Sequence, residues 1–439
     1  MKIGVRACRS YKLRRPSPVA CCFLTFPDHL MSPQAVSLVF ENRVRICGEF
    51  IQGHVELNVP LALEDDIEAV RVKLRGSIYV EITEHRSSTD SHGRHRSSTD
   101  TQRRRTEVLR ADASLWTPGG SQNGQLILPF QFHLPPNLPP SFHCTMTDGK
   151  GIISYGIEVV ADRPGIFKRN RRIASVFSVV PAANPQDLAT QHLLLQGWSG
   201  QWQSIDYEQR MRRGLWGEYS HVKTKLVYPG LAAFPMSTPL PFQIHITIDT
   251  KPMKRTDSPF EDGKPLFPVP PSNFSELSLT LIRNVHLHAY TRRKNKSEMV
   301  LYLGGTGEAT HSSSHSLDMD PPEWIPVDGD KGKGIWRRTV HMQSTLCLSV
   351  PPTHTSQYIS WDYALQLSVP FKGIGNDVDT SSPIWIVPAF ACPPSQPFST
   401  GHNPELTYAD VPPPFPVPSL DLPPAYYEGE HHGWEDEKQ

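Results

Sequence analysis

Hydrophobic and polar residues alternate along most of the chain between residues 36 and 390. In the stretch VRVKL, Val70, Val72 and Leu74 fall on one side, while Arg71 and Lys73 fall on the other. The same alternation recurs in SIYVEI, PFQIHITI, ISYGIEVVAD and DYALQLSV. A period of two is typical of strands with one buried face and one face in water, so the pattern predicts an all-β protein.

The strand-like segments form two blocks, residues 34–182 and 220–390, each near the size of one antiparallel β-sandwich. The connector at 183–219 is rich in tryptophan and contains the clearest helical segment, residues 185–196. Three stretches interrupt the alternation, at 84–105, 254–273 and 304–333, and the one at 84–105 is polar and lacks apolar anchors. The first of these contains the hexamer HRSSTD twice, and all three are predicted to be flexible insertions whose Ser and Thr residues suit phosphorylation.

The two ends of the chain differ from the blocks. Residues 1–33 combine several basic residues with a short apolar run, which predicts a disordered extension, with a targeting segment as the alternative. A start of translation at Met31 is a further alternative. Residues 391–439 are acidic and rich in proline, a composition that predicts a disordered tail.

Composition argues against several classes of protein. Lys and Arg number 44, as do Asp and Glu, so no global field favours nucleic acid or an anionic membrane. The seven cysteines form no C-x-x-C pair, which favours a reducing, cytoplasmic environment over a disulfide framework. No stretch has the roughly 18 apolar residues of a membrane span. Because no G-x-S-x-G, phosphate loop or H-E-x-x-H occurs, we expect neither an enzyme nor a cofactor.

The tail contains a PPxY sequence, Pro423-Pro424-Ala425-Tyr426, preceded by Leu422. Adjacent prolines favour polyproline II before binding, so docking costs little conformational entropy. WW domains bind the proline rings in an aromatic groove and receive the tyrosine in a separate pocket. The spacing therefore predicts a WW-binding site at Leu422, Pro423, Pro424 and Tyr426, with an inert solvated linker as the alternative.

Basic and histidine clusters are the remaining candidates for binding. Three basic clusters follow strand-like segments and are candidates for contact with anionic lipid or acidic partner segments: Lys168, Arg169, Arg171 and Arg172; Lys254 and Arg255; Arg292, Arg293 and Lys294. A solvated sheet rim is the alternative for each cluster. His286 and His288 share a strand face that His245 could join, but solvated histidines are more usual there than a zinc site.

Several segments resemble a known family. VSLVFENRVRICGEFIQGHVELNV is similar to the opening of an arrestin N-terminal domain, although Cys47 stands where the family usually has proline. LILPFQFHLPPNLPPSF followed by ISYGIEVVADRPG is the more specific match, and ISWDYALQLSVPFKG resembles late strands of the arrestin C-terminal domain. The resemblance covers most of residues 36–390. The PPxY tail makes the chain resemble an alpha-arrestin of the fungal type.

This resemblance implies two immunoglobulin-like β-sandwich domains and an adaptor function. Such an adaptor links membrane transporters or receptors to a HECT-type ubiquitin ligase, promotes their ubiquitination and endocytosis, and moves from the cytoplasm to the plasma membrane and endosomes. Family members are often ubiquitinated near Lys168, so Lys168 is a candidate acceptor. Alternatives are an arrestin of ambient-pH signalling, a retromer-like membrane-coat subunit, and an all-β enzyme or sugar-binding protein.

Overall fold

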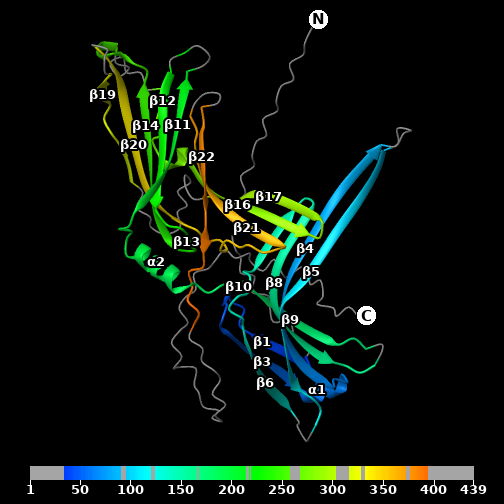
Figure 1. Ribbon diagram of the computed structural model, residues 1–439. Coiled ribbons are helices and arrows are strands. Elements are labelled where there is room, and N and C mark those ends of the chain that lie inside the picture. Colours follow the sequence, from blue (N-terminus) through cyan, green and yellow to red (C-terminus); the bar gives the residue numbers. More distant parts are fainter. Residues whose placement is uncertain are drawn as a thin grey trace, which may run out of the picture.

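The computed structural model of the chain consists mostly of β-strands arranged in two halves (Figure 1). It describes residues 34–89, 95–119, 124–165, 168–213, 217, 219–257, 267–302, 316–327, 332–371 and 376–393. Every sheet takes its strands from one half only, and the large sheets are antiparallel, so the predicted fold class is confirmed. Of the two ends predicted to be disordered, 1–33 and 391–439, the residues 1–33 and 394–439 lie outside the described residues, whereas 391–393 are described.

The N-terminal half contains two facing sheets. One has the order β1-β3-β6, and the other has the order β5-β4-β8-β7, with β9 also pairing with β8. A short parallel pair, β2 and β10, completes the half. Its elements are β1 (Val36–Phe40), β2 (Arg45–Ile46), β3 (Phe50–Asn58), α1 (Val59–Glu64), β4 (Ala69–Thr89), β5 (His95–Trp116), β6 (Gln125–His133), β7 (Phe142–Met146), β8 (Gly149–Asp162), β9 (Arg171–Phe177) and β10 (Val179–Val180).

The C-terminal half repeats this plan. One sheet has the order β11-β12-β14-β20, with β15, β18 and β19 also on β20, and the other has the order β17-β16-β21-β22. β13 and β23 form a second short parallel pair. The strands are β11 (Trp202–Arg212), β12 (Tyr219–Pro229), β13 (Phe234–Pro235), β14 (Pro239–Thr250), β15 (Met253–Lys254), β16 (Ser278–Ala289), β17 (Arg292–Tyr302), β18 (Ser316–Met319), β19 (Glu323–Pro326), β20 (Lys333–Cys347), β21 (Ile359–Val369), β22 (Val378–Ile384) and β23 (Ile386–Val387). The 3₁₀ helices η1 (Arg255–Asp257) and η2 (Phe274–Glu276) lie between strands.

The predicted helix forms the connection between the halves. α2 spans Pro185–Leu195 and packs against β13 and β14. Asn184 caps it by accepting a hydrogen bond from the Asp187 backbone nitrogen at 2.8 Å, and Pro185 occupies the first turn, where no amide hydrogen is needed.

The alternating pattern places the core as predicted. Val70, Val72 and Leu74 on β4 are fully buried, as are the apolar positions of PFQIHITI on β14. Lys73, assigned to the wet face, is nevertheless only 7% exposed. The outer face of this sheet is therefore less open to water than the alternation implies.

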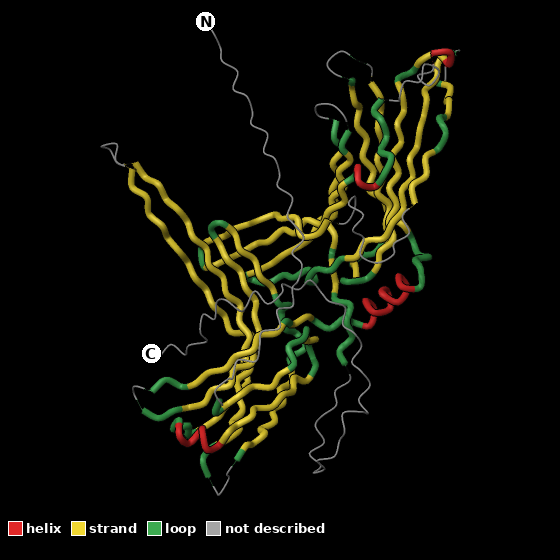
Figure 2. Tube along the Cα trace, turned by 180° about the vertical axis from the view of Figure 1, so that it is seen from behind, coloured by secondary structure: helices red, strands yellow, loops and turns green. Residues whose placement is uncertain are grey.

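The duplicated hexamer differs from the sequence-based expectation of a flexible insertion at 84–105. Residues 84–89 and 95–105 continue β4 and β5, and the two copies pair with each other, with His85 opposite Thr99 and Ser87 opposite Ser97. The pairing of β4 with β8 stops at Ile82, which lies opposite Gly149. Beyond Ile82, β4 pairs only with β5, and the two strands form a two-stranded ribbon (Figure 2). Hydroxyl and imidazole pairs across the ribbon, such as Thr83 with Thr101 at 3.1 Å, replace the apolar anchors that the sequence lacks.

Two other predicted insertions also contain regular structure. Residues 254–257 complete β15 and form η1, while β18 and β19 lie within the 304–333 stretch and pair with β20. Short polar strands carry a weak alternation signal, and the pairing with β20 provides their hydrogen bonds.

A buried tyrosine anchors each half to a proline-containing loop. The Tyr155 hydroxyl donates a hydrogen bond to the Pro139 carbonyl at 2.7 Å, and the Tyr363 hydroxyl donates one to the Pro351 carbonyl at 2.8 Å. The Trp361 indole donates to the neighbouring Pro352 carbonyl at 2.9 Å. In both loops, proline carbonyls therefore accept the hydrogen bonds of buried side-chain donors.

The CGEF step, residues 47–50, sits where the end of the described chain returns to the N-terminal half. Gly48 has a φ of +90°, and a Cβ there would lie 3.1 Å from the Cys392 sulfur. Glu49 is buried and accepts from Arg45 at 3.4 Å, so the two charges compensate each other. Glycine is thus required both by the backbone conformation and by the close approach of residue 392.

The two halves pack against each other through β4, β8 and β16 (Figure 1). Phe142 stacks on Trp361 with ring centroids 4.0 Å apart and an interplanar angle of 9°. Leu287 of β16 lies over Gly151 of β8, where a Cβ would be only 2.6 Å from the leucine side chain. Buried residues of both halves form one continuous hydrophobic cluster.

A polar contact, here called the hairpin clasp, joins the β4–β5 hairpin to the turn between β16 and β17. Arg292 is 14% exposed and bridges Glu84 and Asp100, with 2.7 Å to Asp100. Gln102 donates to Thr291 at 3.2 Å. Two residues further along β5, Arg104 donates to the Tyr358 hydroxyl at 2.8 Å and lies over its ring. The clasp therefore couples the hairpin to the C-terminal half.

Candidate partner-binding surfaces

A groove lies between the edge strands β1 and β9 of the N-terminal half. It has a volume of about 650 Å³ and is lined by Val36, Val159 and Ile173, with Arg171 and Asp65 among its polar residues. Among the described strands, β1 pairs only with β3 and β9 only with β8. Within the described part of the chain, each strand therefore keeps one edge without a ladder partner beside a groove of mixed polar and apolar lining, and free strand edges can bind extended peptide segments.

The first basic cluster lies at this groove, but ion pairs engage most of it. Arg171 contacts Asp65 at 2.7 Å, Arg172 contacts Glu158 at 3.0 Å, and Lys168 contacts Asp66. The hydrogen bond from Lys168 lowers the pKa of the Asp66 carboxyl.

Arg169 is exposed and has no ion pair with any residue that the structure describes. An acidic partner would therefore compete with internal carboxylates for all of this cluster except Arg169.

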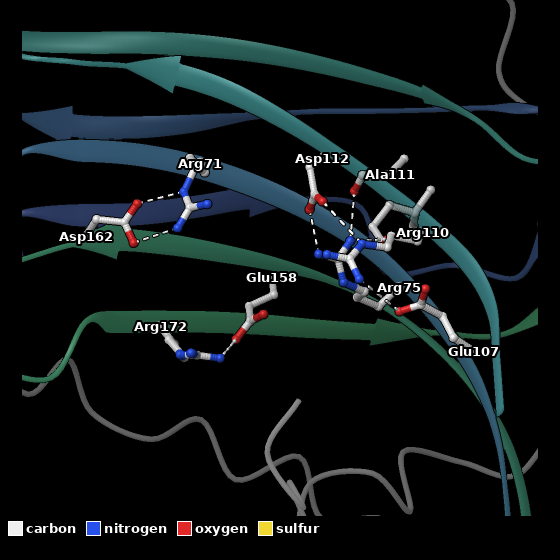
Figure 3. Close-up of polar contacts among 10 residues, drawn as sticks. Arg71, Arg75, Glu107, Arg110, Ala111, Asp112, Glu158, Asp162 and Arg172 are labelled. Atoms are coloured by element: carbon white, nitrogen blue, oxygen red, sulfur yellow. Dashed lines mark hydrogen bonds and ion pairs between the residues drawn. The ribbon is translucent and has the colours of Figure 1, made fainter. Parts of the chain in front are cut away.

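The adjoining sheet face is also balanced in charge (Figure 3). Arg71 of β4 forms two contacts with Asp162 of β8, at 2.6 and 2.8 Å. Arg75 contacts Asp112 of β5 at 2.6 Å and donates to the Ala111 carbonyl at 3.1 Å. These cross-strand pairs explain how arginines can lie on a face that is partly shielded from water.

The second and third basic clusters lie away from the first. Lys254 and Arg255 are exposed on β15 and η1, beside the first residues of β20. In the third cluster, Arg292 belongs to the hairpin clasp and Lys294 contacts Asp148 at 3.5 Å, while Arg293 is exposed. The structure therefore does not bring the three clusters into one patch, and the third helps to join the halves.

The histidines singled out in the sequence occupy two different sheets. His286 contacts Asn295 at 3.0 Å, and His288 contacts two backbone carbonyls, both on the β16 sheet. His245 lies on β14, where it contacts His341. Among the described residues, no group of three or more His, Cys, Asp or Glu side chains is placed to hold a metal ion.

A crevice of about 540 Å³ lies where the halves meet, and sequence analysis gave no indication of it. Prolines from both halves line it, together with Ile78, Val108 and His354. The His354 ring lies 4.9 Å from that of Trp361, and its Nε2 is buried without a hydrogen-bond partner. Burial lowers the pKa of His354.

The predicted WW-binding residues 422–426 lie outside the described residues. No described helix is long and apolar enough to cross a membrane.

Comparison with known protein families gives a match for the N-terminal half. Residues 36–185 match the family model of the arrestin (or S-antigen) N-terminal domain, so this part of the chain is similar to that domain. The match covers all strands from β1 to β10 and therefore includes the groove between β1 and β9. Among curated proteins, none matches the chain.

Proposed function

We propose that this protein is a non-enzymatic adaptor of the alpha-arrestin type. Its folded part binds cytosolic segments of membrane transporters or receptors, and its tail binds a WW-domain-containing HECT-type ubiquitin ligase. The main support is the combination of an arrestin-type N-terminal domain with a PPxY sequence beyond the second sandwich. The groove between β1 and β9 offers free strand edges to an extended partner segment.

The proposed mechanism is proximity. One chain that holds both cargo and ligase raises the effective concentration of the ligase at the cargo, without chemistry of its own. Basic residues without an ion pair to any described carboxylate, such as Arg169, Arg255 and Arg293, would contact acidic cargo segments or anionic lipid. Lys168 is half exposed and is the proposed ubiquitin acceptor, so Lys168→Arg should reduce modification of the adaptor itself.

The test is a titration of the full chain with an isolated WW domain of a HECT-type ligase. The neighbouring residues Tyr426 and Tyr427 offer a matched pair, because only Tyr426 has the PPxY spacing. We expect Tyr426→Ala to weaken binding at least about tenfold, the effect of removing one anchor side chain from its pocket. Tyr427→Ala should leave it nearly unchanged. Equal effects of the two variants, or no binding by the unmodified chain, would refute the link to the ligase.

A further inference from the structure

Two histidines face each other across the outer surface of the β11-β12-β14-β20 sheet. His245 of β14 lies directly opposite His341 of β20 in the antiparallel register. Their Nδ1 atoms are 2.7 Å apart, and the ring planes are nearly perpendicular at 78°. Since the strands are neighbours within a continuous sheet, the backbone holds both rings in position.

An aspartate fixes the tautomer of one ring. The His341 Nε2 lies 3.0 Å from an Asp320 carboxylate oxygen, and the Asp320 backbone nitrogen donates to the Thr339 carbonyl at 3.0 Å. An ionised carboxylate only accepts hydrogen bonds, so Nε2 of His341 carries the proton. The Nδ1 lone pair of neutral His341 therefore points at His245.

A pair of imidazole nitrogens with a carboxylate behind one ring is also the arrangement that transition-metal sites use. Imidazole nitrogen is a preferred ligand of zinc and copper, and a ligating histidine usually donates its other nitrogen to a carboxylate. Asp320 contacts the nitrogen that faces away from His245, so it orients the ligand and does not coordinate. This is consistent with the lack of a three-donor cluster among the described residues.

The surroundings disfavour a charge on His245 and leave the pair open to water. Burial, followed by the neighbouring His341 and Lys225, lowers the pKa of His245. Lys225 is 3.9 Å from Asp206 on β11, and the Thr247 and Thr339 hydroxyls occupy the next cross-strand position. The His341 side chain is 35% exposed, so water has access to the remaining coordination positions.

We propose that His245 and His341 bind a zinc-class divalent ion through their Nδ1 atoms, with Asp320 as the orienting carboxylate. Zinc–nitrogen bonds of 2.0–2.1 Å in tetrahedral geometry need the two nitrogens about 3.3 Å apart, so the rings separate by about 0.6 Å. His245 then moves its proton from Nδ1 to Nε2, and no proton is released. With two protein ligands the ion exchanges readily, and it links two central strands of the second sandwich.

The test is calorimetric titration of the chelator-treated full chain with Zn²⁺, with Mg²⁺ as the ion that such a nitrogen site should not bind. We expect His245→Gln and His341→Gln each to abolish one equivalent of Zn²⁺ binding. Asp320→Asn should keep the stoichiometry but weaken that equivalent about 10- to 100-fold. The control is the double variant His286→Gln/His288→Gln, which removes two histidines from the other sheet and should change neither value.

Bound copper gives an independent readout. With one equivalent of Cu²⁺, electron paramagnetic resonance of the unmodified chain should show nitrogen coupling from two imidazoles, and His245→Gln should reduce it to one. The unfolding temperature in chelator should be similar for His245→Gln and the unmodified chain, which separates loss of metal from loss of fold. Unchanged Zn²⁺ stoichiometry in the His245 and His341 variants, or a copper spectrum indifferent to His245, would overturn the proposal.

Discussion

The contact between Gly151 and Leu287 allows a direct test of how the halves pack. Leu287 is 1% exposed, and a methyl group at residue 151 would lie 2.6 Å from its Cδ2 atom. Leu287→Ala removes a buried side chain and should cost about 2–5 kcal/mol of unfolding free energy. Gly151→Ala inserts a methyl into filled space and should cost about 1–3 kcal/mol. The two residues come from different halves, so they share this space only if the halves are docked.

The double variant distinguishes a shared contact from two separate defects. In Gly151→Ala/Leu287→Ala, the new methyl occupies part of the space that the leucine vacates. We therefore expect the double variant to lose at least about 1 kcal/mol less than the sum of the single losses. The measurement is urea unfolding followed by tryptophan fluorescence for the four proteins under identical conditions. Gly119→Ala is the control, because a Cβ there meets nothing within 4 Å. Additive losses would refute the packing described for this contact.

Four further outcomes follow from the structure. Tyr155→Phe removes a buried hydrogen bond and should lower the unfolding free energy by about 1–3 kcal/mol in the same urea assay. Arg292→Ala leaves the two carboxylates of the hairpin clasp without their cation, so trypsin should cleave the β4–β5 hairpin faster, and unchanged cleavage would contradict the clasp. Burial lowers the pKa of His354, so the unfolded chain binds a proton at this histidine at a higher pH than the folded chain does. The unfolding free energy should therefore fall as the pH drops below about 6.5. His354→Gln should reduce this loss by at most about 1.4 kcal/mol per pH unit, as urea unfolding at several pH values would show. Burial raises the pKa of Cys47 to about 11, so at pH 8 the native protein should resist maleimide at Cys47 but react at exposed Cys347, as mass spectrometry of the labelled peptides would show.

The elements that could be predicted from the sequence are those with a hydrophobic pattern in their own residues. The alternation in PFQIHITI places four buried side chains on β14, and the helical segment predicted at 185–196 corresponds to α2. Each depends on residues close together in the chain, so the local pattern is sufficient to find it.

The ribbon formed by the duplicated hexamer could not be predicted in this way. Its residues are polar on both faces, so no buried side produces an alternation of hydrophobicity, and composition alone indicates a flexible loop. Strand formation there depends on pairing between the two copies and on the clasp with Arg292, which lies almost two hundred residues further along the chain. The polar composition was interpreted correctly, but it does not determine the backbone conformation.

In the candidate sites, too, single residues could be identified from the sequence, whereas their contact partners could not. The basic clusters are visible in the sequence, but their internal partners, such as Asp65 for Arg171, are not. The pair of His245 and His341 is separated by 96 positions and depends on the β14–β20 register. In the sequence, His286 and His288 share a strand face, and His245 was a candidate to join them, but it lies on a different sheet.

The hairpin clasp also has a mechanical consequence. Beyond Ile82 the β4 arm continues through Thr89, a length of about 23 Å at the usual rise per residue. The clasp contacts this ribbon near its base, where Arg292 forms ion pairs with Glu84 and Asp100. Because the clasp ties the ribbon at its base to the C-terminal half, the direction in which the ribbon projects depends on how the two sandwiches are docked.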